Sequence, residues 1–175
     1  MGLPIGINQL LNGKVVEWER IDFKKGWNPE DVVHSICAFA NDMHNWGGGY
    51  IVIGVEEDKG TPMLPPIGID IKDLDDIQKE VLNLMHKIEP LPIVIPEPVE
   101  YMGKNILILW IPGGEARPYK APIHLGAKEM QKARQSFIHA EDNDDGSVRY
   151  MGCVRNGIDE HTAEKIFDDM DAFAQ

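Results

Sequence analysis

Two groups of acidic residues in the first third of the sequence could together hold a divalent metal ion. One group precedes a helix with clear start signals and the other follows an apolar stretch; they are Glu17, Glu19 and Asp22, and Glu56, Glu57 and Asp58. Side chains at strand ends face the cleft at the edge of a sheet, so the two groups could converge. Three carboxylates at one place can bind Mg²⁺ or Mn²⁺, which stabilises charge in phosphodiester hydrolysis. The alternative is two unrelated acidic patches that face solvent.

A basic cluster is the second candidate for chemistry. Between residues 116 and 135 five basic side chains face only Glu129, a local charge of +4: Arg117, Lys120, Lys128, Lys132 and Arg134. Such a cluster can contact the phosphates of DNA or RNA, because local charge steers a polyanion more than total charge does. The alternative is a solvated loop and helix face. Residues 141–175 carry ten acidic and three basic side chains, so they would have to face away from a nucleic acid.

Two short motifs resemble ion-binding loops but have simpler interpretations. The stretch 142–146 opens like a calcium loop, yet Gly152 stands where the twelfth-position Glu belongs, so a hairpin turn at Asp145-Gly146 is favoured. Gly47-Gly48-Gly49 could cradle a phosphate with its backbone N–H groups. No Gly-Lys-Ser/Thr follows it, so a tight helix-to-strand connection is favoured. Asn41 is expected to act as a C-terminal helix cap.

The elements that position these residues follow from hydrophobic spacing and cap signals. A helix over 29–41 is predicted because Asn28 can cap it and Pro29 suits its first position. The apolar, β-branched run 50–55 predicts a buried strand. The other expected elements are a short helix at 4–12, a strand ending at Phe23, a helix from Asp70 or Asp73 to Lys87, a hairpin of 93–99 and 105–111 whose first strand lies at an edge, a short helix at 127–135, a strand pair at 137–140 and 147–153, and a helix at 160–173.

These elements make an α+β fold, a mixed β-sheet packed by two or three helices. We expect one domain over 1–175, with a core at 14–140 and an acidic hairpin and terminal helix at 141–175. The chain has 175 residues, 43% of them hydrophobic, which suits one globular domain. Two cysteines without CxxC spacing suggest reduced thiols, and no apolar stretch is long enough to cross a membrane, so a soluble cytoplasmic protein is expected. The formal net charge of −12 excludes a binder whose whole surface is basic.

Four motifs resemble, in their order, those of the Schlafen/AlbA-like family, often described as a DNA-binding domain. They are Glu17-x-x-x-x-Asp22-Phe23-Lys24, the stretch Ala38-Phe39-Ala40-Asn41, the stretch 48–55 that runs from Gly-Gly to Ile-Gly-Val, and Gly68-Ile69. The likeness is dense over 17–69 and continues at Arg117-Pro118-Tyr119. Two departures stand out: the second Glu of the family pattern is Asp22 here, and five residues, Asp42 to Trp46, replace a very short link before the glycines.

The resemblance implies a nucleic-acid-binding domain of a transcriptional regulator, with DNA or RNA as partner and Arg117, Lys120, Lys128, Lys132 and Arg134 on the phosphates. A second implication is a Schlafen-type, metal-dependent endoribonuclease. Glu17, Asp22 and Glu57 would then be the catalytic residues and the ligands of Mg²⁺ or Mn²⁺; we expect binding rather than catalysis. A non-catalytic module for protein interaction or homo-oligomerisation is the third hypothesis. No membrane partner is expected.

Overall fold

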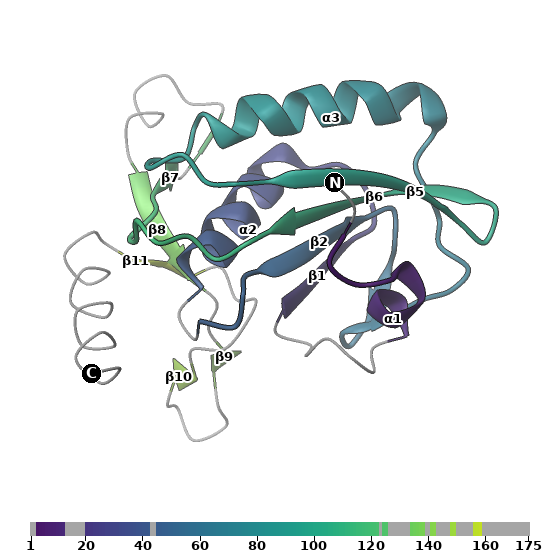
Figure 1. Ribbon diagram of the computed structural model, residues 1–175, viewed down its shortest axis with the longest axis horizontal. Coiled ribbons are helices and arrows are strands. Elements are labelled where there is room, and N and C mark those ends of the chain that lie inside the picture. The colour runs from purple at the N-terminus through teal and green to yellow at the C-terminus, as the bar shows by residue number, and fades with distance from the viewer. Residues whose placement is uncertain are drawn as a thin grey trace.

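The computed structural model describes residues 3–12, 20–42, 45–122 and 124–125, together with the backbone of four short strands between 134 and 158. Figure 1 shows a sheet with α2 and α3 on one side and α1 on the other. The elements are α1 (Ile7–Leu11), β1 (Ile21–Lys24), α2 (Pro29–Asn41), β2 (Gly49–Ile53), β3 (Glu57–Asp58), β4 (Thr61–Pro62), α3 (Ile71–Met85), β5 (Ile95–Tyr101), β6 (Lys104–Ile111), β7 (Ala121–Pro122), β8 (Arg134–Ile138), β9 (Glu141–Asp142), β10 (Val148–Arg149) and β11 (Asn156–Ile158). The α+β class with a mixed sheet is confirmed.

The central sheet has the strand order β1-β2-β6-β5. β1 and β2 are parallel, with Asp22 opposite Ile51, whereas β6 is antiparallel to both of its neighbours. β5 lies at an edge of this sheet, as its prolines predicted. Because β1 and β2 are parallel, the residues before both strands lie together at the edge of the sheet where the two strands begin. The residues after both strands lie together at the opposite edge, where the two strands end.

α2 begins and ends where the sequence predicted. The side chain of Asn28 accepts a hydrogen bond from the backbone N–H of Asp31, and Pro29 occupies the first turn. Two acidic residues in that turn lie at the positive end of the helix dipole. Nearly the whole C-terminal half of α2 is buried, because the helix contacts the sheet, α3 and the strands β7 and β8. α3 starts after Asp70, which is one of the two caps that were expected.

Alternation along the strands divides the hydrophobic core into two clusters. Ile51, Ile53 and Leu107 face α2 and α3, while Tyr50 and Val52 face the other side, where the segment around α1 covers them. Complete burial of each large aliphatic side chain stabilises the fold by about 1.5–3 kcal/mol. The same alternation on β1 turns Ile21 and Phe23 away from α2, so Asp22 and Lys24 lie on the side of α2.

Four predictions concern the later part of the chain. The predicted helix at 127–135 is wrong at its end, because Arg134 and Gln135 belong to β8; the tertiary pairing with β7 outweighs the local pattern. The predicted pairing of 137–140 with 147–153 is also wrong, since β8 pairs with β7 and β11, and β10 pairs with β9. The turn at Asp145-Gly146 and the helix at 160–173 lie outside the described residues.

No helix in the described part of the chain has the length and apolar character to cross a membrane.

Candidate functional site

Asp22 and Lys24 form an ion pair on the α2 side of β1. The Lys24 Nζ lies 2.9 Å from Asp22 Oδ2 and 2.5 Å from Asp31 Oδ2 on α2. Ser35 Oγ, also on α2, donates a hydrogen bond of 2.5 Å to the same Asp22 oxygen. The lysine side chain is only 8% exposed, so its charge is compensated by these carboxylates rather than by water.

Glu57 follows β2 at the same edge of the sheet and is electrostatically coupled to this pair. Partial burial raises the pKa of Glu57 above its usual value of 4.5, and the negative charge of Asp22 raises it further, whereas Lys24 lowers it. Two of the three predicted metal ligands, Asp22 and Glu57, thus influence one another electrostatically. The third, Glu17, and its neighbour Glu19 lie outside the described residues.

The described acidic residues do not make a complete metal site. No group of three or more His, Cys, Asp or Glu side chains in the described part of the chain is arranged to hold an ion. Asp22 Oδ2 already accepts a hydrogen bond from Ser35 and forms an ion pair with Lys24. Glu56, the residue before Glu57, pairs with the exposed Lys25 instead, at 3.2 Å. Asp22 and Glu57 therefore offer two carboxylates to Mg²⁺ or Mn²⁺, and the buried ammonium group of Lys24 competes with the ion for them.

Asn41, at the end of α2, holds the distant segment around Tyr119. Its Oδ1 accepts a hydrogen bond from the Tyr119 backbone N–H at 2.7 Å, and its Nδ2 donates to the Tyr119 carbonyl at 3.2 Å. The amide is completely buried. The expectation that Asn41 is a C-terminal cap is wrong in this respect, because the cap position is Asp42 and the Asn41 side chain reaches another segment.

The turn after α2 is closed by an internal anion. The Asp42 carboxylate accepts hydrogen bonds of 3.0–3.1 Å from the backbone N–H groups of Trp46, Gly47 and Gly48. These glycine N–H groups were a candidate phosphate cradle, and in the structure a carboxylate of the same chain occupies them. The glycines also permit close approach: a Cβ on Gly48 would collide with the backbone of β6, and one on Gly49 would overlap the ring of Phe39.

Two guanidinium groups contact this turn from different parts of the chain. Arg20, just before β1, donates from Nε to the Gly48 carbonyl at 3.0 Å and from Nη2 to the Gly47 carbonyl at 3.5 Å. Arg117 donates from Nη1 to the carbonyls of Asn41 at 3.2 Å and Asp42 at 2.8 Å. An arginine at the C-terminal end of a helix also interacts favourably with the helix dipole.

Arg117 was a predicted phosphate contact, whereas Arg20 was not. Arg20 lies outside the basic stretch 116–135, between Glu19 and Ile21, so no local charge cluster pointed to it. In the sequence Arg20 falls within the stretch predicted as a strand ending at Phe23, and nothing there marks it as a partner of the glycine turn. It is close enough to Tyr50 that its charge opposes the rise in the Tyr50 pKa that burial causes.

The other basic residues of the predicted cluster are placed only in part. Lys120 lies just before β7, and its backbone pairs with that of Glu89. The backbone of Arg134 lies opposite Pro122 in the β7–β8 pair, so the chain returns Arg134 to the neighbourhood of Lys120. Lys128 and Lys132 lie outside the described residues.

Comparison with known protein families shows the family to which this chain belongs. The sequence model of the family described as "Schlafen, AlbA_2" matches residues 17–146, which is most of the chain. The chain belongs to the Schlafen, AlbA_2 family. The match includes α2, the glycine turn, the central sheet and the Arg117–Tyr119 segment, which are the parts described above.

Two solved structures show how this Schlafen, AlbA_2 domain compares with other proteins. The N-terminal domain of a RecG-related protein from Nitrosomonas europaea is 24% identical, with a TM-score of 0.49, and the alignment covers 85% of this chain and 91% of that one. The DIP2311 protein from Corynebacterium diphtheriae is 17% identical, with a TM-score of 0.44; 85% of this chain aligns with 23% of that protein. The chain therefore spans about a quarter of the DIP2311 protein. No curated protein matches the sequence.

Proposed function

We propose that this Schlafen, AlbA_2 domain binds nucleic acid, and that it contacts phosphates at the sheet edge where β1 and β2 begin. The observation that carries the proposal is the convergence of Arg20 and Arg117 on the turn between Asp42 and Gly48. These two arginines come from distant parts of the chain, and guanidinium groups are well suited to bidentate contact with phosphate. We also propose that the domain binds nucleic acid as part of a transcriptional regulator.

The surroundings of the two arginines are compatible with an anionic ligand. The Asp42 carboxylate is the nearest negative charge on the turn, and three backbone N–H groups compensate it. Lys120 and the backbone of Arg134 lie along the chain that leads away from Arg117, so further basic side chains could extend the contact. α3 offers a poorer surface, because five acidic residues lie on it or at its cap: Asp70, Asp73, Asp75, Asp76 and Glu80.

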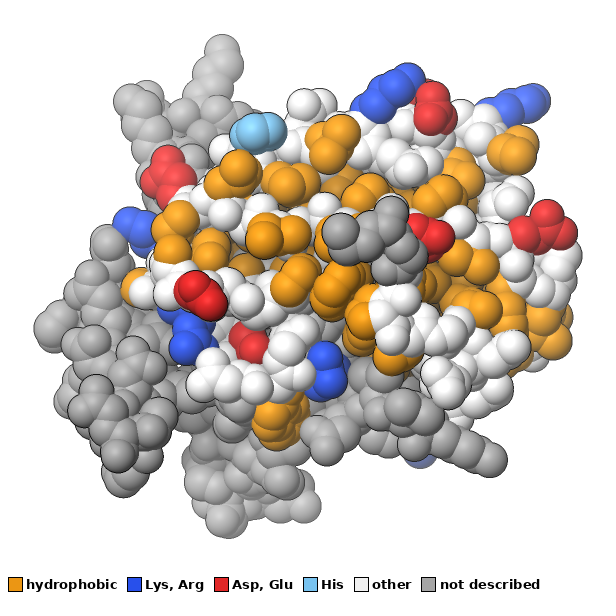
Figure 2. All heavy atoms as spheres, viewed as in Figure 1, with side chains coloured by type: hydrophobic (Ala, Val, Ile, Leu, Met, Phe, Trp, Pro, Cys, Tyr) orange, Lys and Arg blue, Asp and Glu red, His pale blue; other side chains and the backbone are white. Residues whose placement is uncertain are grey.

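The space-filling view gives the same impression of a divided surface. In Figure 2 apolar side chains cover much of the central face, and the charged side chains are dispersed around it. A nucleic acid bound across this face would place many of its phosphates against apolar side chains, which cannot compensate their charge. An approach at the edge of Arg20 and Arg117 avoids both this apolar face and α3.

An electrophoretic mobility shift assay with duplex DNA and with structured RNA tests the proposal. We expect a shift at about 50 mM salt, where phosphate contacts are strong. Arg20→Gln and Lys120→Gln should weaken binding, and each should flatten the plot of log affinity against log salt by about 0.9 if one phosphate contact is lost. Arg20→Lys, which keeps the charge, should bind more tightly than Arg20→Gln. Urea unfolding of each variant establishes that it is folded.

Lys79→Gln is the matched control, because it removes one positive charge from α3, where Lys79 pairs with Asp75 and Asp76. It should leave affinity unchanged within about twofold, since exposed charges beyond a Debye length are screened. Absence of a shift with both nucleic acids, or equal losses for Lys79→Gln and Arg20→Gln, would overturn the proposal. An oligomer detected by light scattering would then favour the third hypothesis, an interaction module.

A metal-dependent endoribonuclease is the second candidate, favoured by the electrostatic influence of Asp22 on the pKa of Glu57. Glu17 would have to complete the set of ligands. Incubation of structured RNA with Mn²⁺ tests this candidate, with Glu57→Ala as the decisive variant and Glu97→Ala on β5 as the control. Loss of cleavage in Glu57→Ala alone would support it. Cleavage that survives Glu57→Ala, or no cleavage at all, would contradict it.

A further inference from the structure

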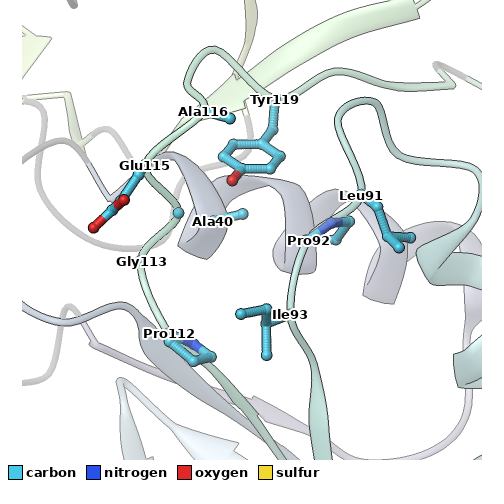
Figure 3. A pocket seen from close by; sticks show the side chains of 10 residues that line it. Ala40, Leu91, Pro92, Ile93, Pro112, Gly113, Glu115, Ala116 and Tyr119 are labelled. Carbon is cyan, nitrogen blue, oxygen red and sulfur yellow. The ribbon is translucent and has the colours of Figure 1, made fainter.

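A pocket of about 340 Å³ opens between two segments that leave the central sheet. Its walls include Leu91 and Ile93 on one segment and Pro112 on the other, and Ala40 of α2 lies at its base (Figure 3). It is separate from the acidic residues on β1, which lie near the start of α2. Volumes of this order hold small organic ligands.

The pocket forms where the pairing between β5 and β6 has ended and before the two segments that continue from these strands pair with each other again. The last strand pair is Ile95 with Trp110, after which the two backbones diverge. Pro112 follows β6 directly and has no N–H to continue the ladder. The backbone closes the far side at Glu89 and Lys120, which exchange N–H···O hydrogen bonds of 2.9 and 2.7 Å. Backbone pairing at both ends of the pocket therefore keeps it open as part of the fold.

The hydroxyl group of Tyr119 is the polar group that this pocket offers. Figure 3 shows the ring projecting from its wall with the oxygen directed into the pocket, toward Ala40. Tyr119 is only 5% exposed, and no hydrogen bond to its hydroxyl occurs within the described part of the chain. A buried tyrosine hydroxyl normally has a partner, and one that lacks it costs free energy.

Two features fix the hydroxyl in this position. Asn41 binds the N–H and the carbonyl group of Tyr119, which fixes the backbone position from which the ring projects. Gly114 gives the oxygen its space, since a Cβ at that residue would overlap the hydroxyl. A hydroxyl group without a hydrogen-bond partner among the described residues thus lies at the wall of an apolar pocket.

The rim of the pocket indicates what kind of ligand it would take. Leu91 and Ile93 are 55% and 62% exposed, which is unfavourable for aliphatic side chains unless another apolar group covers them. Glu115 is the charged residue among those that line the pocket, and Figure 3 shows its carboxylate directed away from the Tyr119 hydroxyl. The walls are therefore suited to an uncharged apolar body, and only the hydroxyl to a polar atom.

We propose that this pocket binds a small, uncharged ring compound that carries one hydroxyl or carbonyl group, with that group hydrogen-bonded to Tyr119. A rigid ring fits better than a flexible chain, because it loses less conformational freedom in a small pocket with rigid proline walls. The proposal is independent of nucleic-acid binding and does not require either arginine.

Phenol and toluene are the probes, because they match in shape and differ only in the polar group. Binding to the full chain is measured by titration of backbone amide shifts in NMR spectra. We expect phenol to bind about three- to tenfold more tightly than toluene, the range of one net hydrogen bond. The shifts should centre on Ile93, Gly113 and Tyr119.

Tyr119→Phe is the decisive variant, since it removes the hydroxyl and keeps the ring. It should abolish the preference for phenol and leave toluene affinity within about twofold. Ile93→Ala, at an exposed rim position that will not disturb folding, should weaken both probes and keep the preference. Tyr101→Phe at the end of β5 is the matched control and should change nothing. Equal binding of both probes to the native chain, a preference that survives Tyr119→Phe, or no shifts at these residues would overturn the proposal.

Discussion

The side chain of Asn41 binds both the N–H and the carbonyl group of the Tyr119 backbone. The two residues are 78 positions apart, and they belong to two of the motifs that mark the family, Ala-Phe-Ala-Asn and Arg-Pro-Tyr. One amide thus fixes the end of α2 to the segment that carries Arg117 and lines the pocket. The two motifs are the two sides of a single buried contact.

The first prediction is that Asn41→Ala strongly destabilises the domain. The substitution leaves the buried Tyr119 N–H without the acceptor that now satisfies it, at a cost of about 1–3 kcal/mol, and leaves the Tyr119 carbonyl with the weak thiol donor of Cys37 in place of the amide. We expect the free energy of unfolding to fall by about 2–4 kcal/mol, measured by urea denaturation. The Asn83→Ala variant is the control, because Asn83 is exposed on α3; it should lie within about 0.5 kcal/mol of the native chain. Equal stability of the two variants would show that the contact is dispensable.

The helices and the central strands were predictable because local signals decide them. Asn28 and Pro29 start α2, Asp70 starts α3, and the prolines of β5 put that strand at an edge. These signals work at a range of a few residues, where backbone hydrogen bonding and side-chain caps compete directly. The strand pairings after residue 120 depend on contacts with α2 and β7, and the local pattern there was misleading.

The candidate site was predictable in its members but not in their partners. The pattern Glu-x-x-x-x-Asp-Phe-Lys identified Asp22, yet only the fold shows that Lys24 lies between Asp22 and Asp31. The glycine stretch pointed to an anion cradle, and the anion proved to be Asp42 of the same chain. Long-range pairs of this kind have no spacing rule, so a single sequence cannot reveal them.

The second prediction concerns the contact of Gly49 with Phe39. Gly49→Ala should destabilise the domain by about 1–3 kcal/mol, because the added methyl group overlaps the Phe39 ring. In the double variant Gly49→Ala/Phe39→Leu the two costs should not add, since the smaller side chain makes room, and the coupling should exceed about 0.5 kcal/mol. Gly26→Ala, where nothing lies within 4 Å, is the control for the loss of a glycine. Strict additivity in the urea denaturation series would contradict the proposed steric contact.

The third prediction is that Lys24→Met destabilises the domain by about 2–3 kcal/mol, below the cost of breaking a fully buried ion pair because Asp31 is 30% exposed. The variant leaves Asp22 without its counter-charge beside α2. Adding Asp22→Asn to Lys24→Met should restore part of the loss, because the unpaired charge is then removed. Lys25→Met is the control: its pair with Glu56 is exposed, and we expect a change of less than about 0.5 kcal/mol in the free energy of unfolding. A double variant less stable than Lys24→Met would rule out an unpaired charge as the cause.

The fourth prediction uses the raised pKa of Glu57, which results first from burial and then from the charge of Asp22. The folded chain holds this proton more tightly than the unfolded chain, so the contribution of Glu57 to stability is present below its ordinary pKa and is lost as pH rises through the folded value. Glu57→Gln should therefore gain stability relative to the native chain between acidic and neutral pH, as measured by urea denaturation. In Lys24→Met, NMR titration should find the Glu57 pKa higher still, because Lys24 lowers it. An unchanged titration in that variant would mean that the charge of Lys24 does not act on Glu57.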